Sequence, residues 1–80
     1  MRIVKDLTQM KAGEIGRVAD IQGGWGLLRK TDALGIKVGT EIVKVSSQLM
    51  RGPIIIRVGN TQVAIGFGMA RRIFVASREG

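Results

Sequence analysis

Twelve glycines divide this 80-residue chain into short segments, and their spacing limits the length of every helix and strand. Glycine is unfavourable inside regular elements and common in turns. Turns at such short intervals are typical of a small all-β domain. The length fits one domain, and we expect residues 1–80 to form it.

Five segments of the chain have the β-branched composition of short strands. We expect strands at residues 14–21, 40–45, 53–58, 61–66 and 72–76. Apolar residues in the first of these do not alternate strictly, and a β-bulge near Gly16 would account for that. Gly59 and Asn60 predict a tight hairpin between the third and fourth strands, because both residues tolerate positive φ.

One helix is expected over residues 27–34, with Gly35 capping its C-terminal end. Four residues of this segment recur at helical spacing and would lie on one face of the helix: Leu27, Leu28, Thr31 and Leu34. A further helical turn would fit residues 68–72. Five short strands with one inserted helix predict a small β-barrel of the SH3-like or OB-like kind.

The stretch GWGLLRKT at residues 24–31 resembles a phosphate-binding P-loop, which reads G-x-x-x-x-G-K-[ST]. Lys30 and Thr31 match that pattern, but Arg29 stands where the second glycine belongs and would fill the space of the phosphate. A P-loop also requires a parallel βαβ unit, which the expected strands do not form. We therefore interpret this stretch as a glycine-rich turn that leads into the helix.

Trp25 is the only tryptophan of the chain and follows directly on that turn. One interpretation is that its side chain packs as a lid over one end of the core. The alternative is that Trp25 anchors a binding partner, because tryptophan is enriched at interaction hot spots.

The residue types present exclude most catalytic and metal chemistry. The chain contains no histidine and no cysteine, which removes disulfides, thiolate ligands and the commonest general base. The serines therefore have no histidine to activate them, and the carboxylates show no spacing that gathers them around a metal ion. We expect no catalytic residues, no metal site and no cofactor, and we do not expect an enzyme.

Thirteen lysines and arginines against six acidic residues give a net charge of +7. Such a basic domain is suited to nucleic acid, an anionic membrane surface or an acidic protein face. Only three residues are aromatic, which is few for a barrel that stacks single-stranded bases. The first thirteen residues lack a signal-peptide core and no segment is long and apolar enough to span a membrane, so a cytoplasmic location is expected.

The segment SSQLMRG at residues 46–52 lies between two expected strands and carries Leu49, Met50 and Arg51 where turns favour small polar residues. Leu49 could pack beneath the barrel as part of the core. The alternative, which we adopt, is that these three residues form a protein contact.

The order of these segments resembles the ferrous-iron transport protein A (FeoA) family over nearly the whole chain. The matching features are Leu7 and Gly13–Gly16, the glycine-rich turn, LGI at 34–36 followed by Gly39–Thr40, Gly52–Pro53, VAIG at 63–66, and Ala70 before Ile73 and Val75. Thr31 and Val38 depart from the family pattern, which usually has leucine and proline at those positions.

The resemblance implies an SH3-like barrel and a cytoplasmic accessory or regulatory protein of bacterial ferrous-iron uptake. Its partner would be the ferrous-iron permease with its cytoplasmic G domain, and self-association is a further expectation. Members of the family are often described as binding transition metals, for which this chain has neither cysteine nor histidine. The alternative function is a basic nucleic-acid-binding barrel or a module of the metal-repressor type. Specific binding of nucleic acid is not expected.

We predict that the isolated chain neither binds nor hydrolyses GTP or ATP, because Arg29 occupies the space that a P-loop leaves for phosphate. Isothermal titration calorimetry with each nucleotide tests this expectation. Micromolar affinity that disappears in the Lys30→Ala variant would contradict it.

Overall fold

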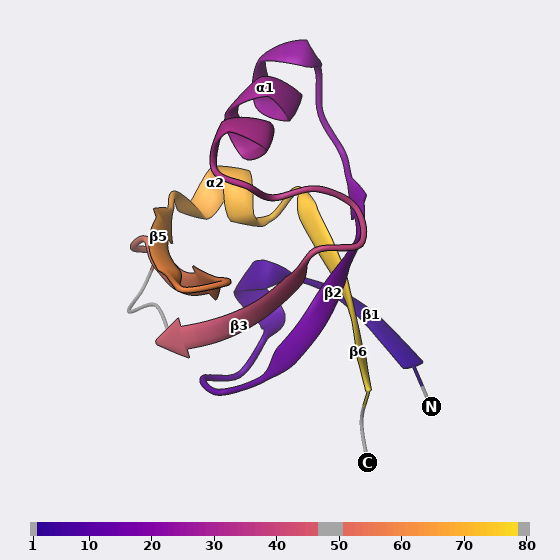
Figure 1. Cartoon of the computed structure of the whole chain (residues 1–80), viewed down its shortest axis with the longest axis vertical. Coiled ribbons are helices and arrows are strands. Elements are labelled where there is room, and N and C mark those ends of the chain that lie inside the picture. Colours follow the sequence, from indigo (N-terminus) through magenta and orange to yellow (C-terminus); the bar gives the residue numbers. More distant parts are fainter. Residues whose placement is uncertain (1, 47–50, 79–80) are drawn as a thin grey trace.

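The computed structural model describes residues 2–46 and 51–78, which form six antiparallel strands curled into a small barrel (Figure 1). In chain order the elements are β1 (Arg2–Asp6), the 3-10 turn η1 (Leu7–Gln9), β2 (Ile15–Ile21), α1 (Trp25–Ala33), β3 (Glu41–Ser46), β4 (Ile54–Val58), β5 (Thr61–Ile65), α2 (Phe67–Ala70) and β6 (Ile73–Arg78). Neighbouring strands follow the order β1-β6-β2-β3-β4-β5. The expectation of an all-β barrel of the SH3-like kind with one inserted helix is confirmed.

All five expected strands are present within two residues of their predicted ends, but the sixth, β1, was not predicted. Three of its five residues are charged, so its sequence lacks the apolar alternation of a strand. β1 is bonded to β6 at the opposite end of the chain, with Val4 opposite Ala76. The strand therefore depends on a distant partner rather than on its own composition.

The β-bulge in β2 was predicted at the wrong residue. The register of β2 against β6 shifts between Val18 and Asp20, not near Gly16. Gly16 is needed for another reason: a Cβ atom there would lie 3.2 Å from the Ala76 carbonyl oxygen and 3.2 Å from the Val75 Cβ. The missing side chain thus allows β2 and β6 to approach closely.

Two glycines confirm the predicted ends of elements. Gly35 has φ +81° immediately after α1, and Gly59 has φ +60° in the β4–β5 hairpin, where Val58 pairs with Thr61. Both lie in the left-handed region that glycine enters without strain. Helix α1 begins at Trp25, two residues before its predicted start, and α2 forms the short turn expected near residue 68.

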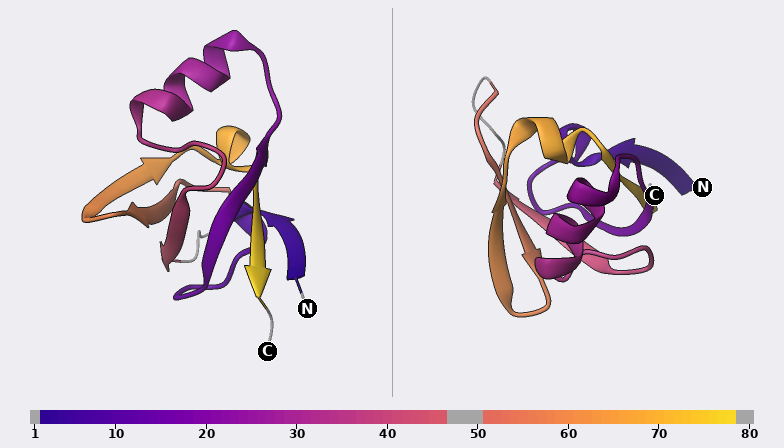
Figure 2. Two further views of the ribbon diagram at one scale, coloured as in Figure 1. Left: turned by 45° about the vertical axis from the view of Figure 1, so that its right-hand side comes forward. Right: turned by 90° about the horizontal axis from the view of Figure 1, so that it is seen from above.

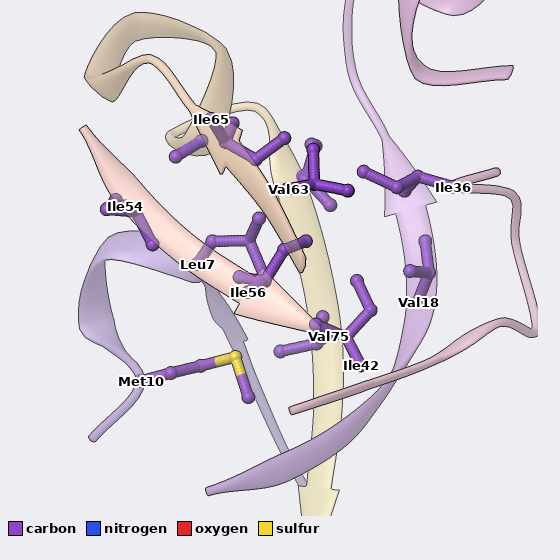
Figure 3. Packing of buried hydrophobic residues seen from close by; sticks show 12 residues of the cluster. Leu7, Met10, Val18, Ile36, Ile42, Ile54, Ile56, Val63, Ile65 and Val75 are labelled. Atoms are coloured by element: carbon purple, nitrogen blue, oxygen red, sulfur yellow. The ribbon is translucent and has the colours of Figure 1, made fainter. Parts of the chain in front are cut away.

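The barrel interior is filled almost entirely by aliphatic side chains (Figure 3). They alternate along the strands, as Ile54 and Ile56 do on β4, so that each strand turns one face inward. The buried apolar set is Leu7, Met10, Val18, Ile36, Ile42, Ile54, Ile56, Val63, Ile65, Ala70, Ile73 and Val75. No aromatic residue belongs to this set.

Lys44 interrupts the apolar interior, because it shares the inward face of β3 with Ile42 and is only 1% exposed. Its Nζ donates hydrogen bonds of 2.9 Å to the carbonyl oxygens of Leu7 and Met10. Burial lowers the pKa of Lys44, while the charges of Asp6 and Glu14 raise it. The amine thereby joins β3 to the turn that follows β1.

Glu14 forms a second polar cluster beside this lysine. Its Oε2 lies 3.0 Å from Lys5 Nζ and accepts a hydrogen bond from the Ser77 hydroxyl, and its Oε1 accepts one from the Lys11 backbone N–H. Burial alone would raise the pKa of Glu14, but the hydrogen bonds from Ser77, Lys11 and Lys5 lower it from 4.5 to about 2. The cluster ties β1, β6 and the start of β2 together.

We predict that the free energy of unfolding falls as the pH is lowered from about 4.5 to about 2. The folded chain holds the Glu14 carboxylate ionised more strongly than the unfolded chain, so its contribution is present above pH 4.5 and lost as the pH falls through 2. Its size should be about 1–2 kcal/mol, because partial solvation weakens the cluster.

Urea titrations at several pH values, on the parent chain and on Glu14→Gln, measure this contribution. The variant should show a shallower loss of stability over that interval. The same pH dependence in both proteins would show that other carboxylates are responsible.

Candidate functional site

Helix α1 stands at one end of the barrel, outside the curled sheet (Figures 1 and 2). The chain leaves β2 through Gly23 and Gly24, runs through the helix and returns to β3. The Leu27 side chain packs against Gly23, since a Cβ there would lie 2.3 Å from Leu27 Cδ2 and would force that side chain to move. Thr31 anchors the helix: it is 1% exposed, and its hydroxyl donates a 3.0 Å hydrogen bond to the Leu28 carbonyl. Helix and returning segment together enclose a groove.

The groove has a volume of about 430 Å³ and an apolar centre. Its apolar lining consists of Ile21, Trp25, Leu28, Ile36 and Val38. Ile36 belongs to the core and forms the floor, whereas Trp25 and Val38 are 80% and 65% exposed and form the rim. The apolar side chains of Trp25 and Val38 are therefore exposed to solvent at the rim of this groove.

The structure contradicts the interpretation of Trp25 as a lid over the core. Trp25 is the first residue of α1, and side chains in a helix lean toward its N-terminus, so the indole projects beyond the helix end. The core beneath is already filled by aliphatic side chains. The alternative, that Trp25 contacts a partner, remains a prediction.

The sequence reasoning did not identify Leu28 or Val38 as parts of a surface site. Leu28 was placed on the same helix face as Thr31, which is buried, yet Leu28 is 37% exposed. Val38 carried a usable signal, because an apolar residue between Gly35 and Gly39 falls in a turn region where polar residues are usual. The groove itself could not be inferred, since its two walls meet only in the folded chain.

Cations surround this end of the molecule. Arg29 and Lys30 lie on α1, are exposed, and make no ion pair with any residue that the structure describes. Arg71 and Arg72 follow α2 at the same end, where the Gln22 N–H bonds to the Arg72 carbonyl at 2.8 Å. Of the basic residues beside the groove, Lys37 has a carboxylate partner, in Asp32 at 3.4 Å.

The second predicted contact lies largely beyond what the structure describes. Leu49 and Met50 fall outside the described residues, and Arg51 is exposed in the turn before β4. The prediction that these three residues form a protein contact therefore stays a prediction.

The local structure agrees with the prediction that residues 24–31 do not form a P-loop. Helix α1 follows a strand of an antiparallel sheet, and the buried Thr31 hydroxyl is hydrogen-bonded to the Leu28 carbonyl of the same helix. Over residues 2–46 and 51–78, no three histidine, cysteine or acidic side chains are gathered as metal ligands. The donor set of the described residues therefore does not fit a resident metal ion. In the same residues, no helix is long and apolar enough to cross a membrane.

A sequence model of the FeoA domain family matches residues 5–77 of this chain. A protein of Methanocaldococcus jannaschii assigned by name as an Fe(2+) transport protein A is 33% identical over 69 residues, covering 86% of this chain and 82% of that protein. The crystal structure of an iron uptake regulatory protein (FeoA) is 38% identical, with a TM-score of 0.83, and the match covers 91% of this chain and 95% of that one.

A manganese-dependent transcriptional repressor has a similar fold, with a TM-score of 0.87 and 23% identity. The match covers 98% of this chain but 44% of the repressor. At this identity the likeness concerns the fold alone.

We predict that a substitution at the rim of the groove changes stability little, whereas one at its floor lowers stability strongly. Trp25→Ala should change the free energy of unfolding by about 0.5 kcal/mol or less, because the indole is mostly solvated. Ile36→Ala should cost about 2–4 kcal/mol, because it leaves a cavity in the core. Chemical denaturation of both variants, followed by circular dichroism, checks the pair. A large loss for Trp25→Ala would restore the lid interpretation.

Proposed function

This chain belongs to the FeoA domain family, and from that premise we propose that it is an accessory protein of ferrous-iron uptake that regulates the Fe(II) permease by direct contact. The family is involved in Fe(II) transport, which the names of the two similar proteins express. The observation that carries the proposal is the match to the family along residues 5–77, nearly the whole chain. On this proposal Fe(II) is the cargo of the permease and not a ligand of this chain.

A role in binding rather than catalysis is supported by the chemistry of the described residues. The chain has no histidine, and the Ser77 hydroxyl is buried and hydrogen-bonded to the Glu14 carboxylate. Glu14 is itself paired with Lys5, so neither group is available to a substrate. We propose that the chain is not an enzyme and that it works in the cytoplasm, where the permease would present its G domain.

For the permease contact we propose the segment that carries Leu49, Met50 and Arg51. Arg51 is exposed, and arginine is enriched at binding hot spots because its planar fork pairs well with carboxylates. Trp25 belongs to a different surface, at the α1 end, whose partner is argued below. Self-association of the chain through either surface remains a second expectation.

A regulatory module of the repressor or nucleic-acid-binding type is the alternative function. The fold shared with the manganese-dependent repressor and the net charge of +7 favour it. A gel-shift titration over a range of salt concentrations separates the two functions. Binding that is tight, selective for sequence and resistant to salt would favour the alternative, whereas weak binding with a steep salt dependence would reflect charge alone.

We predict that Met50→Asp weakens association with the detergent-solubilised permease by about 1–3 kcal/mol, because it places a charge in a desolvated contact. If the segment is a contact rather than core, stability should change by about 0.5 kcal/mol or less, which is the usual effect of a substitution outside the core. Pull-down with the tagged chain and thermal denaturation of the same samples provide the two measurements.

Gln62→Asp is the matched control, since it adds the same charge at an exposed position on β5. It should leave association unchanged. A Met50→Asp variant that unfolds at much lower temperature would identify this segment as core and end the contact proposal, as would equal weakening by both variants.

A further inference from the structure

We propose that the α1 end of the barrel binds the surface of an anionic lipid bilayer, with Trp25 seated among the headgroups. The proposal concerns a different surface from the permease contact and does not depend on that partner. It is argued from three features of the described residues: the exposed apolar rim, the cations beside it and the placement of the carboxylates.

The rim offers the apolar side chains that an interfacial contact requires. Trp25 and Val38 are 80% and 65% exposed, and Leu28 is 37% exposed on the same groove. Tryptophan favours the boundary between headgroups and acyl chains, because its ring is apolar while its N–H remains hydrogen-bonded. Helix α1 stands clear of the sheet at one end of the barrel (Figure 2).

The cations at this end have no carboxylate partner among residues 2–46 and 51–78. They are Arg29 and Lys30 on α1 and Arg71 and Arg72 after α2. Asp20 and Asp32 are the carboxylates on the groove, and Asp32 is already paired with Lys37. This end therefore carries an excess of positive charge. Each basic residue close to an anionic bilayer strengthens the attraction between the protein and the bilayer.

The other carboxylates that the structure describes lie near partners outside this end and do not neutralise it. Glu14 pairs with Lys5, Glu41 lies 4.0 Å from Arg17, and Asp6 accepts the Thr8 backbone N–H at the start of η1. Apolar rim and unpaired cations thus coincide at one end of the molecule. This combination is typical of interfacial helices, which bury an apolar face and keep basic residues at the headgroups.

A bilayer fits these observations better than the other acidic partners. Nucleic acid would favour a track of cations with several aromatic platforms, but this end has a single aromatic side chain on its groove. An acidic protein face would account for the cations alone, whereas the headgroup region of a bilayer accommodates both the cations and the exposed indole. Both partners become outcomes of the test.

The test uses the intact chain with vesicles of phosphatidylcholine alone and of phosphatidylcholine mixed with phosphatidylglycerol. Trp25 is the only tryptophan and there is no tyrosine, so intrinsic fluorescence reports this surface directly. We expect co-sedimentation with the phosphatidylglycerol vesicles, a blue shift of the emission, quenching by brominated lipid, and loss of binding as salt is added. Binding to neither vesicle, or binding without a blue shift, would overturn the proposal.

The double variant Arg29→Glu with Lys30→Glu should bind phosphatidylglycerol vesicles at least about tenfold more weakly, and Trp25→Ala should weaken sedimentation by a similar factor. The matched control is Lys11→Glu with Arg57→Glu, which reverses two exposed cations that do not line the groove. The control should bind within about threefold of the parent chain, since those cations lie outside the contact. Equal weakening by both double variants would show attraction by net charge alone and would overturn the assigned surface.

Circular dichroism of every variant confirms that the barrel is folded before binding is compared. The permease pull-down is done in detergent without a bilayer, so its failure would concern the proposed function and not this surface. Tighter binding of an acidic protein or of DNA than of the vesicles, abolished by the α1 variants, would also overturn the bilayer as partner.

Discussion

The insertion of β6 between β1 and β2 is the constraint on which the rest of the structure depends. It places the last described strand at the interior of the sheet, bonded on one side to β1 and on the other to β2. The close approach of Gly16 to Val75 and Ala76 makes this pairing possible. Because β6 runs opposite to β2, α2 precedes it at the same end where α1 leaves, and both helical segments lie at one end of the barrel (Figure 1).

Two polar clusters hold the N-terminal segment against this sheet. Lys44 Nζ donates hydrogen bonds to the carbonyl groups at the two ends of η1, those of Leu7 and Met10, and Glu14 joins Lys5 to Ser77. A buried amine is costly unless its hydrogen bonds are satisfied, so these carbonyl partners account for a lysine inside an aliphatic core. Asp6 and Glu14 lie beside these clusters, whereas Asp20 and Asp32 at the α1 end are outnumbered there by basic residues. The basic residues and the apolar rim at the α1 end therefore do not belong to the Lys44 and Glu14 clusters that stabilise the fold.

Much of the fold could be predicted because its signals are local. The hairpin at Gly59, the end of the helix at Gly35 and the inward alternation of β4 each follow from a few neighbouring residues. The features that were missed depend on distant partners. β1 requires β6, and the bulge after Val18 depends on how β2 meets that strand. The prediction that Trp25 covers the core was wrong because the identity of a residue does not reveal whether the core beneath it is already filled by other side chains.

Of the candidate site, the sequence by itself determined the ingredients: one tryptophan behind a glycine turn, two adjacent cations in a short helix, an apolar residue in a turn, and an excess of basic charge. These are properties of composition and near-neighbour spacing, which the chain carries whether folded or not. Only the tertiary structure decided that Trp25 and Val38 share a groove, that Arg72 lies beside the strand leading to α1, and that Lys44 is buried. The physical reason is that such contacts join residues far apart in the chain. Their geometry is set by which strands pair and by the volume that the core leaves free.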